Sequence, residues 1–360
     1  MLDFADIEKQ AQRQLDMTAD IEVSANSRDF SVSAQKNGLL ITPTFPSVIT
    51  WSLETVHKMY QALSIALYPK VTLLPVESFQ VIANQTGSLS NGRSIFLPYM
   101  IGYPRRLKIA NLKQFISQNK NGHKIPLMQN VFLNIDDLVS LGISGESGHG
   151  KSWLLRYLMW WFYELSNKNN KCMTVIDVKG SEPVNFANQR QIKALYPQSS
   201  NNFNDFLGQV DDELSSVIDL IHQRQQQLIK QPTANFTRFY LIIDEILALG
   251  LSNGSKQLVN NISTQLSQIA VMGRQSKVTL IIAGQQLNVK GVVSSELRNQ
   301  LNCIVSLSQT PAINQLVLPD VDYQNIIIPV DGLPARGLAR IPGNFAGGIM
   351  PFLAPTYREE

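Results

Sequence analysis

The sequence predicts an α/β fold with a mostly parallel sheet, preceded by a smaller α+β domain. Two observations support this prediction. Between residues 138 and 307, apolar runs of strand length alternate with amphipathic segments of helix length, which is typical of a parallel sheet covered on both faces. A glycine-rich stretch, Gly145-Glu-Ser-Gly-His-Gly-Lys-Ser152, also lies between one such apolar run and an apolar-rich helix candidate. The 360 residues are enough for one large or two ordinary domains.

Composition sets limits on the class of protein. Hydrophobic residues make up 44% of the chain and charged residues 16%, which is a globular and not a disordered composition. The net charge of +3 permits a polyanionic partner without requiring one. The two cysteines, Cys172 and Cys303, lie in apolar runs and indicate a reduced core. No 18-residue apolar stretch and no signal peptide is visible, so we expect a cytoplasmic chain that reaches a membrane only through a partner.

The first third of the sequence indicates a short helical segment followed by a small domain. Residues 1–25 read as a polar helical segment and residues 26–124 as the small α+β domain, with strands at 30–33, 38–42, 71–74 and 79–82 and a helix before residue 67. The stretch from Ser88 to Lys124 is rich in Gly, Ser, Asn and basic residues with aromatic residues between them. Such a run is compatible with a nucleic-acid surface, but it is more commonly a solvated charged face.

Residues 125–345 predict the larger domain, and residues 346–360 a C-terminal strand and tail. A hairpin is expected at 125–133 and a closing hairpin at 337–341 and 347–352. The remaining strands are expected at 138–143, 172–176, 239–243, 278–283 and 302–307, and the helices at 152–162, 203–228 and 256–272.

The glycine-rich stretch fits the pattern G-x-x-x-x-G-K-[ST]. In this pattern backbone N–H groups cradle the phosphates of a nucleotide at the N-terminus of the following helix. The loop residues expected to bind the nucleotide are Gly145, Glu146, Ser147, Gly148, His149, Gly150, Lys151 and Ser152. Lys151 would reach the β- and γ-phosphates, and the Ser152 hydroxyl would hold Mg²⁺. An ordinary glycine-rich turn is the alternative, and the strand before it and helix after it argue against that alternative.

Two adjacent carboxylates close the apolar run that ends at Ile243. A buried strand has little reason to end in paired acids unless they face a cation or a reacting water. Asp244 is expected near Mg²⁺, and Glu245 is placed to orient or deprotonate the attacking water. A helix N-cap pair is the alternative interpretation. Gln285 follows the next predicted strand, where its amide could hydrogen-bond both γ-phosphate and water.

Five separated segments together resemble the motor domain of FtsK/SpoIIIE-type DNA translocases. That family belongs to the RecA-like P-loop ATPases of the FtsK/HerA superfamily, which includes conjugative coupling proteins. The matching segments are Leu138–Ser152, the Val175–Gly180 strand end with Glu182, Leu241–Glu245, Gly273-Arg274 leading into Val278–Gln285, and Asn302–Leu307. The resemblance implies a RecA-like ATPase domain that binds ATP and Mg²⁺ and pumps DNA.

The resemblance also implies roles for single residues. Gln285 becomes the sensor of hydrolysis, and Arg274 a candidate arginine finger that reaches the nucleotide of a neighbouring subunit. A finger acting between subunits implies a homo-oligomer, expected to be a hexamer with double-stranded DNA in its pore, contacted at phosphates without sequence reading. The segment Gln286–Gly291 is the candidate pore loop. A surface arginine at a helix C-terminus is the alternative interpretation of Arg274.

The sequence departs from the chromosome-segregating members of that family. It ends at Glu360 and shows neither a winged-helix module nor a membrane-spanning part, and His149 is unusual in the loop. We therefore expect a compact motor from a plasmid, integrative element or phage, acting in conjugation, replication or packaging with a relaxase, replication or packaging partner. A related ATPase for viral DNA packaging or protein secretion, or a nucleotide-switched adaptor, stays open. Stimulation of hydrolysis by DNA distinguishes these alternatives.

Overall fold

The computed structural model of the chain divides into two compact units. The residues described are 3–18, 30–44, 52–75, 80–83, 92–120, 122–198, 202–251, 255–287, 291–308, 314, 317–318, 326–344 and 348–359. The smaller unit comprises Met1–Arg105, Asp320–Asp331 and Phe345–Pro351, and the larger one Arg106–Pro319, Gly332–Asn344 and Phe352–Glu360.

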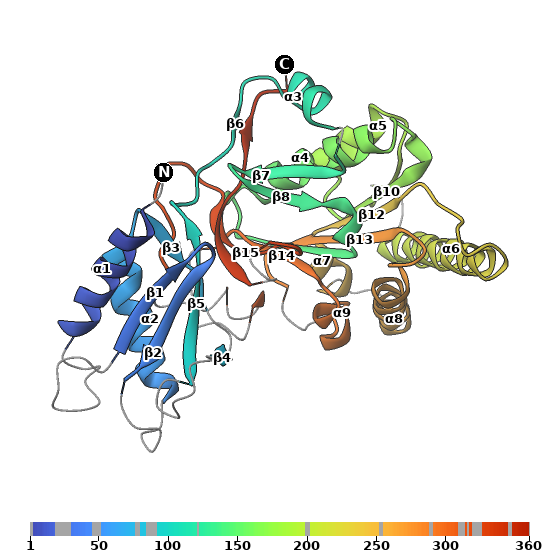
Figure 1. The fold of residues 1–360 in the computed structure, drawn as a ribbon. Helices are drawn as coiled ribbons and strands as arrows, with labels where there is room; N and C mark the ends of the chain where they lie inside the picture. The colour runs from blue at the N-terminus through green and yellow to red at the C-terminus, as the bar shows by residue number, and fades with distance from the viewer. Residues whose placement is uncertain are drawn as a thin grey trace. The chain divides into compact units, whose positions relative to one another are not determined.

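An antiparallel sheet covered by two helices forms the smaller unit (Figure 1). The strand order is β1 (Phe30–Gln35), β2 (Gly38–Pro43), β5 (Arg93–Ile101), β3 (Val71–Leu73), and β4 (Val81–Ala83) also pairs with β5. The helices are α1 (Phe4–Asp16) and α2 (Leu53–Leu67). Side chains from α1, α2 and the sheet, among them Ile7, Leu39 and Met59, are fully buried in one core.

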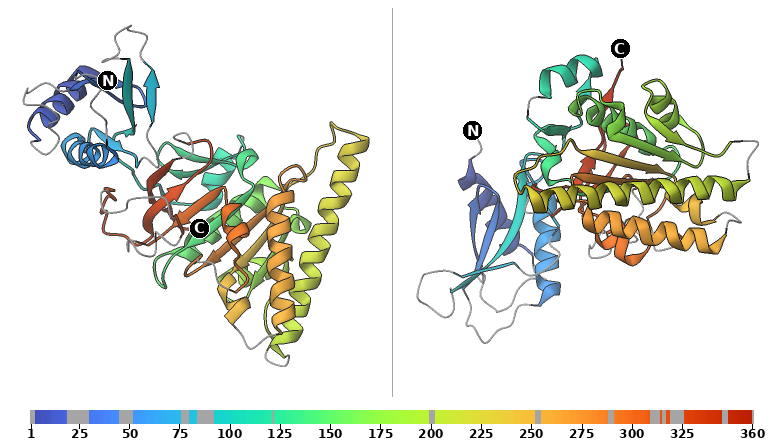
Figure 2. Two further views of the ribbon diagram at one scale, coloured as in Figure 1. Left: turned by 90° about the horizontal axis from the view of Figure 1, so that it is seen from below. Right: turned by 90° about the vertical axis from the view of Figure 1, so that its right-hand side faces the viewer.

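An eight-stranded sheet is the centre of the larger unit (Figures 1 and 2). Its strands, in spatial order, are β11 (Lys193–Leu195), β10 (Met173–Asp177), β12 (Phe239–Asp244), β13 (Val278–Gly284), β9 (Ser140–Ser144), β14 (Cys303–Ser306), β15 (Arg336–Arg340) and β16 (Ile349–Leu353), of which residues 349–351 are grouped with the smaller unit. The strands from β11 to β14 run parallel, and β15 runs antiparallel to β14. Every residue of β9, β10, β12, β13 and β14 is buried, as expected for parallel strands covered on both faces.

Helices cover the two faces of this sheet. On one side lie α4 (Lys151–Leu165) and α5 (Glu182–Asn188), and on the other α7 (Ile246–Leu251), α8 (Lys256–Met272) and α9 (Ser295–Asn299) (Figure 1). The long α6 (Phe203–Lys230) packs along α8. The short α3 (Leu112–Asn119) joins α4 through an edge-to-face contact of Phe115 with Trp161.

Two small pairs of strands complete the larger unit. The hairpin of β7 (Lys124–Met128) and β8 (Val131–Asn134) precedes the main sheet. Near the chain's end, β17 (Thr356–Tyr357) pairs in parallel with β6 (Lys108–Ile109). None of the helices within the described ranges is long and apolar enough to cross a membrane.

Strand register gathers the strand ends at one edge of the main sheet. Asp177 lies opposite Asp244 in the pairing of β10 with β12, and Ser144 lies opposite Gly284 in the pairing of β9 with β13. Because these strands are parallel, their carboxyl ends face the same crevice, where ligands bind in open α/β sheets.

The predicted α/β fold with a mostly parallel sheet and a smaller preceding domain is confirmed. The predicted helix at 256–272 coincides with α8, whereas the sequence analysis missed β5, the strand that pairs with β2, β3 and β4. The two units divide at Arg105–Arg106, so residues 106–124, which the sequence analysis placed in the small domain, lie in the larger unit. The reason is a set of contacts between distant parts of the sequence: the buried Arg106 donates hydrogen bonds to the carbonyls of Pro334 and Ala354, both of which belong to the larger unit.

Candidate nucleotide-binding site

The glycine-rich loop connects β9 to α4 and needs glycine at two positions. Gly148 has φ +81° and Gly150, the residue that caps α4, has φ +84°, a left-handed conformation that other residues rarely adopt. A Cβ atom on Gly150 would also lie 2.4 Å from the Cβ of Ala335. Glycines in this conformation allow backbone N–H groups to turn toward an anion at the start of a helix, and Gly150 directly precedes α4.

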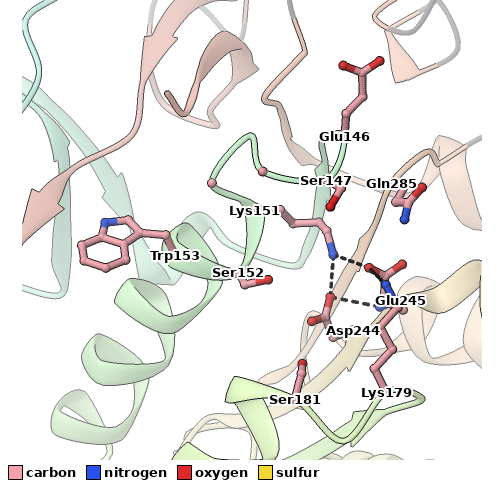
Figure 3. A pocket seen from close by; sticks show the side chains of 12 residues that line it. Glu146, Ser147, Lys151, Ser152, Trp153, Lys179, Ser181, Asp244, Glu245 and Gln285 are labelled. Carbon is pink, nitrogen blue, oxygen red and sulfur yellow. Dashed lines mark hydrogen bonds and ion pairs between the residues drawn. The ribbon is translucent and has the colours of Figure 1, made fainter. Parts of the chain in front are cut away.

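A pocket of about 350 Å³ opens beside this loop. Figure 3 shows the side chains around it. Its lining residues are Glu146, Ser147, Gly148, Gly150, Lys151, Ser152, Trp153, Lys179, Ser181, Asp244, Glu245 and Gln285. The structure thus brings together most of the predicted loop residues, both predicted carboxylates and the predicted sensor glutamine. The predicted loop residues Gly145 and His149 lie in the same loop without lining the pocket, and the His149 Nε2 atom lies 3.6 Å from a Glu146 carboxylate oxygen.

Two lysines hold the acidic pair in this structure. Lys151 Nζ donates to Asp244 Oδ1 at 3.1 Å and to Glu245 Oε1 at 3.0 Å. Lys179 Nζ donates to the same Glu245 oxygen at 2.8 Å. The Lys151 and Asp244 side chains are only 7% and 2% exposed, whereas that of Lys179 is 55% exposed. The buried charges of the pocket are therefore paired, as burial requires.

The surroundings shift the pKa values of these groups in different directions. Burial raises the pKa of Asp244, and the attraction of Lys151 only partly opposes it. Burial also tends to raise the pKa of Glu245, but hydrogen bonds and charges from Lys179 and Lys151 outweigh it and leave that pKa below its usual range. Burial tends to lower the pKa of Lys151, and the two carboxylates reverse this and raise it. At neutral pH Glu245 is therefore ionised, the form that a general base needs.

Glu245 has a backbone conformation unusual for its residue type. Its φ is +53°, and its N–H donates to Asp244 Oδ1 at 3.0 Å. A non-glycine residue in this region costs on the order of 1–3 kcal/mol, and such residues cluster at functional sites. The turn places the Glu245 carboxylate beside the ammonium groups of Lys151 and Lys179 (Figure 3).

The turn after β10 positions Lys179. The fully buried Asp177 accepts hydrogen bonds from the backbone N–H of Lys179, at 2.9 Å, and from the N–H and hydroxyl of Ser181. Gly180 completes the turn with φ +62°. Sequence analysis assigned this segment to the family resemblance without giving Lys179 a role. Only the register of β10 with β12 reveals that Lys179 faces Glu245.

The remaining predicted residues differ in their placement. Gln285 lines the pocket just after β13, as predicted. Arg274 lies in the turn between α8 and β13, so the seven residues of β13, about 23 Å at 3.3 Å per residue, separate it from the pocket within one chain. Of the candidate pore loop, residues 288–290 lie outside the described residues.

The donors at the pocket fit a magnesium ion that shares its ligands with phosphate. The Ser152 hydroxyl points from the first turn of α4 toward the side where Asp244 lies (Figure 3). Magnesium at nucleotide sites takes one or two protein oxygens together with phosphate oxygens and water, which are the ligand types that Ser152 and Asp244 supply. Within the described residues, no cluster of three His, Cys, Asp or Glu side chains could hold a metal by itself.

Comparison with known proteins finds a family model that matches the part of the chain around this pocket. Residues 140–292 match a family described as "AAA domain". No curated protein matches the chain. The fold is similar to that of the pCW3 conjugation coupling protein TcpA, solved in a monomer form with ATPγS, with a TM-score of 0.56 and 16% identity over 97% of this chain and 95% of that one.

Two further solved structures match part of the chain with lower TM-scores. The cytoplasmic domain of the Thermomonospora curvata type VII secretion ATPase EccC gives a TM-score of 0.46 and 18% identity over 65% of this chain and 29% of that one. The genome packaging NTPase B204 of Sulfolobus turreted icosahedral virus 2, in complex with AMPPCP, gives 0.37 and 13% over 61% and 98%. At these identities the likeness concerns the fold, and the P-loop ATPase fold predicted from the sequence is confirmed.

Proposed function

We propose that this chain hydrolyses ATP and uses the energy to move double-stranded DNA through a ring of subunits. The match of residues 140–292 to a family described as "AAA domain" supports the ATPase part of this proposal. One observation carries the proposal of hydrolysis. An ionised glutamate, Glu245, lies beside the phosphate loop and is held by two lysines. A protein that only binds nucleotide needs the loop but has no use for a glutamate placed to activate water.

The residues of the pocket divide the chemistry between them. The loop N–H groups and the N-terminus of α4 bind the phosphates. Lys151 leaves Asp244 and Glu245 and neutralises charge on the β- and γ-phosphates. Asp244 and Ser152 would be the residues that hold Mg²⁺, and the metal would supply positive charge to the phosphate oxygens. Glu245 then orients or deprotonates the attacking water, and Gln285 hydrogen-bonds it and the γ-phosphate.

Arg274 requires a neighbouring subunit for its proposed role. Within one chain it precedes β13, at the opposite edge of the sheet from the pocket, and the strand between them is about 23 Å long at 3.3 Å per residue. A finger that contributes to catalysis must therefore come from another subunit, and we propose a homohexamer on this ground and on the resemblance to ring translocases. Guanidinium groups in this role typically accelerate hydrolysis by about 10³-fold or more.

The substrate of the motor is proposed to be double-stranded DNA, contacted at phosphates in the pore. The five matching segments of the sequence support it, and so does the likeness in fold to a conjugation coupling protein over nearly the whole chain. The proposed setting is a mobile element, in conjugation, replication or packaging, with a relaxase, replication or packaging protein as partner. The buried, unpaired cysteines Cys172 and Cys303 favour the cytoplasm, and any association with a membrane would be supplied by a partner.

Steady-state ATPase rates with and without linear double-stranded DNA test this proposal, with Glu245→Gln as the blank. We expect a large stimulation by DNA in the wild type. Hydrolysis that DNA does not stimulate would favour a protein-secretion ATPase. Nucleotide binding without hydrolysis beyond the blank, with or without DNA, would favour a nucleotide-switched adaptor. Lys151→Ala should abolish nucleotide binding and serves as a second control.

A further inference from the structure

The pocket has two ends that differ in character (Figure 3). At one end lie the charged groups Lys151, Asp244, Glu245 and Lys179. At the other, attached to the first turn of α4, lies the indole of Trp153. A nucleotide whose γ-phosphate approaches Glu245 extends its α-phosphate and the groups attached to it away from that end. Trp153 therefore lies on the side to which the sugar and base are directed.

The chain's last strand holds the Trp153 ring in place. The indole N–H donates to the carbonyl of Pro355 at 3.1 Å. The ring of Tyr357 packs against the indole, with centroids 4.2 Å apart and planes 30° apart, and the Tyr357 hydroxyl donates to the Trp153 carbonyl at 3.1 Å. Tyr357 is only 5% exposed, but Trp153 remains 40% exposed.

The strand itself is anchored independently of Trp153. The Ala354 carbonyl accepts a hydrogen bond from the buried Arg106. Beyond the strand, the Glu359 carboxylate accepts hydrogen bonds from Arg156 at 2.8 Å and from the Trp160 indole at 3.3 Å. The indole of Trp153 is thus fixed by packing and by its N–H, while part of its surface is left open beside the pocket.

We propose that Trp153, backed by the C-terminal residues Pro355 and Tyr357, is the platform on which the base of the bound nucleotide stacks. A flat, preorganised aromatic ring that is partly exposed in a pocket offers apolar area without the entropy cost of ordering it. Stacking uses the face of a base, which every base has, and does not read donors and acceptors at its edge. This inference rests on the proposed function, because it concerns the nucleotide that the same pocket binds.

The platform implies a preference by ring area. Purine triphosphates should bind more tightly than pyrimidine triphosphates, since the larger ring covers more of the indole. ATP and GTP should differ little from each other through this contact. Removal of a stacking aromatic typically costs about 1–3 kcal/mol per base, so Trp153→Ala should bind ATP on the order of ten-fold more weakly.

Calorimetric titration with ATP and with inorganic tripolyphosphate, both with Mg²⁺, tests the platform. Tripolyphosphate occupies the phosphate loop but has no base. Trp153→Ala should lose about ten-fold in ATP affinity and keep its affinity for tripolyphosphate, which also shows that the loop is intact. Trp153→Phe, which retains an aromatic face, should bind ATP nearly as well as the wild type. Tryptophan emission of the wild type should change with ATP but not with tripolyphosphate, and this change should be absent in Trp153→Phe.

The outcomes separate the platform from the proposed function. Equal ATP affinity in the wild type and Trp153→Ala overturns the platform, and so does a parallel loss of ATP and tripolyphosphate binding. A wild type that binds tripolyphosphate as tightly as ATP likewise overturns the platform but leaves the phosphate site standing. A wild type that binds neither ligand overturns the proposed function, and the platform with it.

Discussion

Lys151→Met should destabilise the nucleotide-free protein, because Lys151 is the ammonium that compensates Asp244. The Asp244 side chain is 2% exposed, and Lys151 Nζ lies 3.1 Å from its Oδ1 atom. Methionine keeps most of the length of the lysine side chain and removes its charge. Glu245 retains Lys179 at 2.8 Å, so the substitution leaves mainly Asp244 as a buried charge without its lysine.

The expected magnitude follows from that burial. Removal of one partner of a buried ion pair typically costs about 3–5 kcal/mol. We expect the lower end, about 3 kcal/mol, because Glu245 keeps a partner and the pocket admits water. Asp244→Asn in the same chain removes the uncompensated charge. The double variant should therefore be closer in stability to the wild type than Lys151→Met is, with a coupling energy of roughly 1–3 kcal/mol.

The cost should also depend on pH. Burial already raises the pKa of Asp244 in the wild type, and loss of Lys151 raises it further. A carboxyl group whose folded-state pKa lies above its unfolded value binds more protons when folded, so stability falls as pH rises. Lys151→Met should accordingly be most destabilised at neutral and alkaline pH, and the loss should shrink as the pH is lowered toward the raised pKa of Asp244.

Urea unfolding at pH 8 and pH 6, without nucleotide, measures these differences. Tryptophan fluorescence can follow the unfolding of the larger unit. Three of the four tryptophans, Trp153, Trp160 and Trp161, lie in α4, the helix that begins at Lys151. Stability of Lys151→Met equal to that of the wild type at pH 8 would refute the pairing. A cost that Asp244→Asn fails to relieve would show that the loss comes from packing and not from charge.

Three further predictions concern turnover. Glu245→Gln should bind ATP as the wild type does but hydrolyse it about 10²–10⁴-fold more slowly; unchanged turnover would remove Glu245 from the mechanism. Lys179→Met removes the hydrogen bond that keeps the pKa of Glu245 low, so the acid limb of the pH–rate profile should move to higher pH, and an unmoved limb would show that Lys179 does not tune this carboxylate. Arg274→Ala subunits mixed with Lys151→Ala subunits should recover part of the hydrolysis that each lacks alone, and no recovery counts against a finger acting between subunits.

Local patterns in the sequence predicted the parts of the fold that depend on short-range order. The helix at 256–272 has its apolar residues on one face, and the structure gives it those bounds. The strand β5 was missed because Pro98 lies inside its apolar run, Ile95–Ile101, and polar and basic residues flank that run on both sides. Its partners come from separate parts of the chain, so only the tertiary pairing shows it as a strand.

The site also has parts that short-range sequence patterns predict and parts that only the tertiary structure reveals. Motif spacing predicted that the loop, Asp244, Glu245 and Gln285 would converge on one pocket, and they do. Lys179 could not be assigned, because its contact with Glu245 depends on the register between β10 and β12. Trp153 lies next to the loop in sequence, but the residue that packs against it, Tyr357, is 204 residues away. Sequence patterns report neighbours along the chain, whereas these contacts depend on the assembled sheet and the last strand.

The central claim is that ATP hydrolysis in this pocket drives movement along DNA. Displacement of a short third strand from a DNA triplex, placed at a distance from the end of a linear duplex, measures such movement directly. We expect displacement that requires ATP and that is lost in Lys151→Ala and Glu245→Gln. Rapid DNA-stimulated hydrolysis by the wild type, with no displacement of the third strand, would contradict the account.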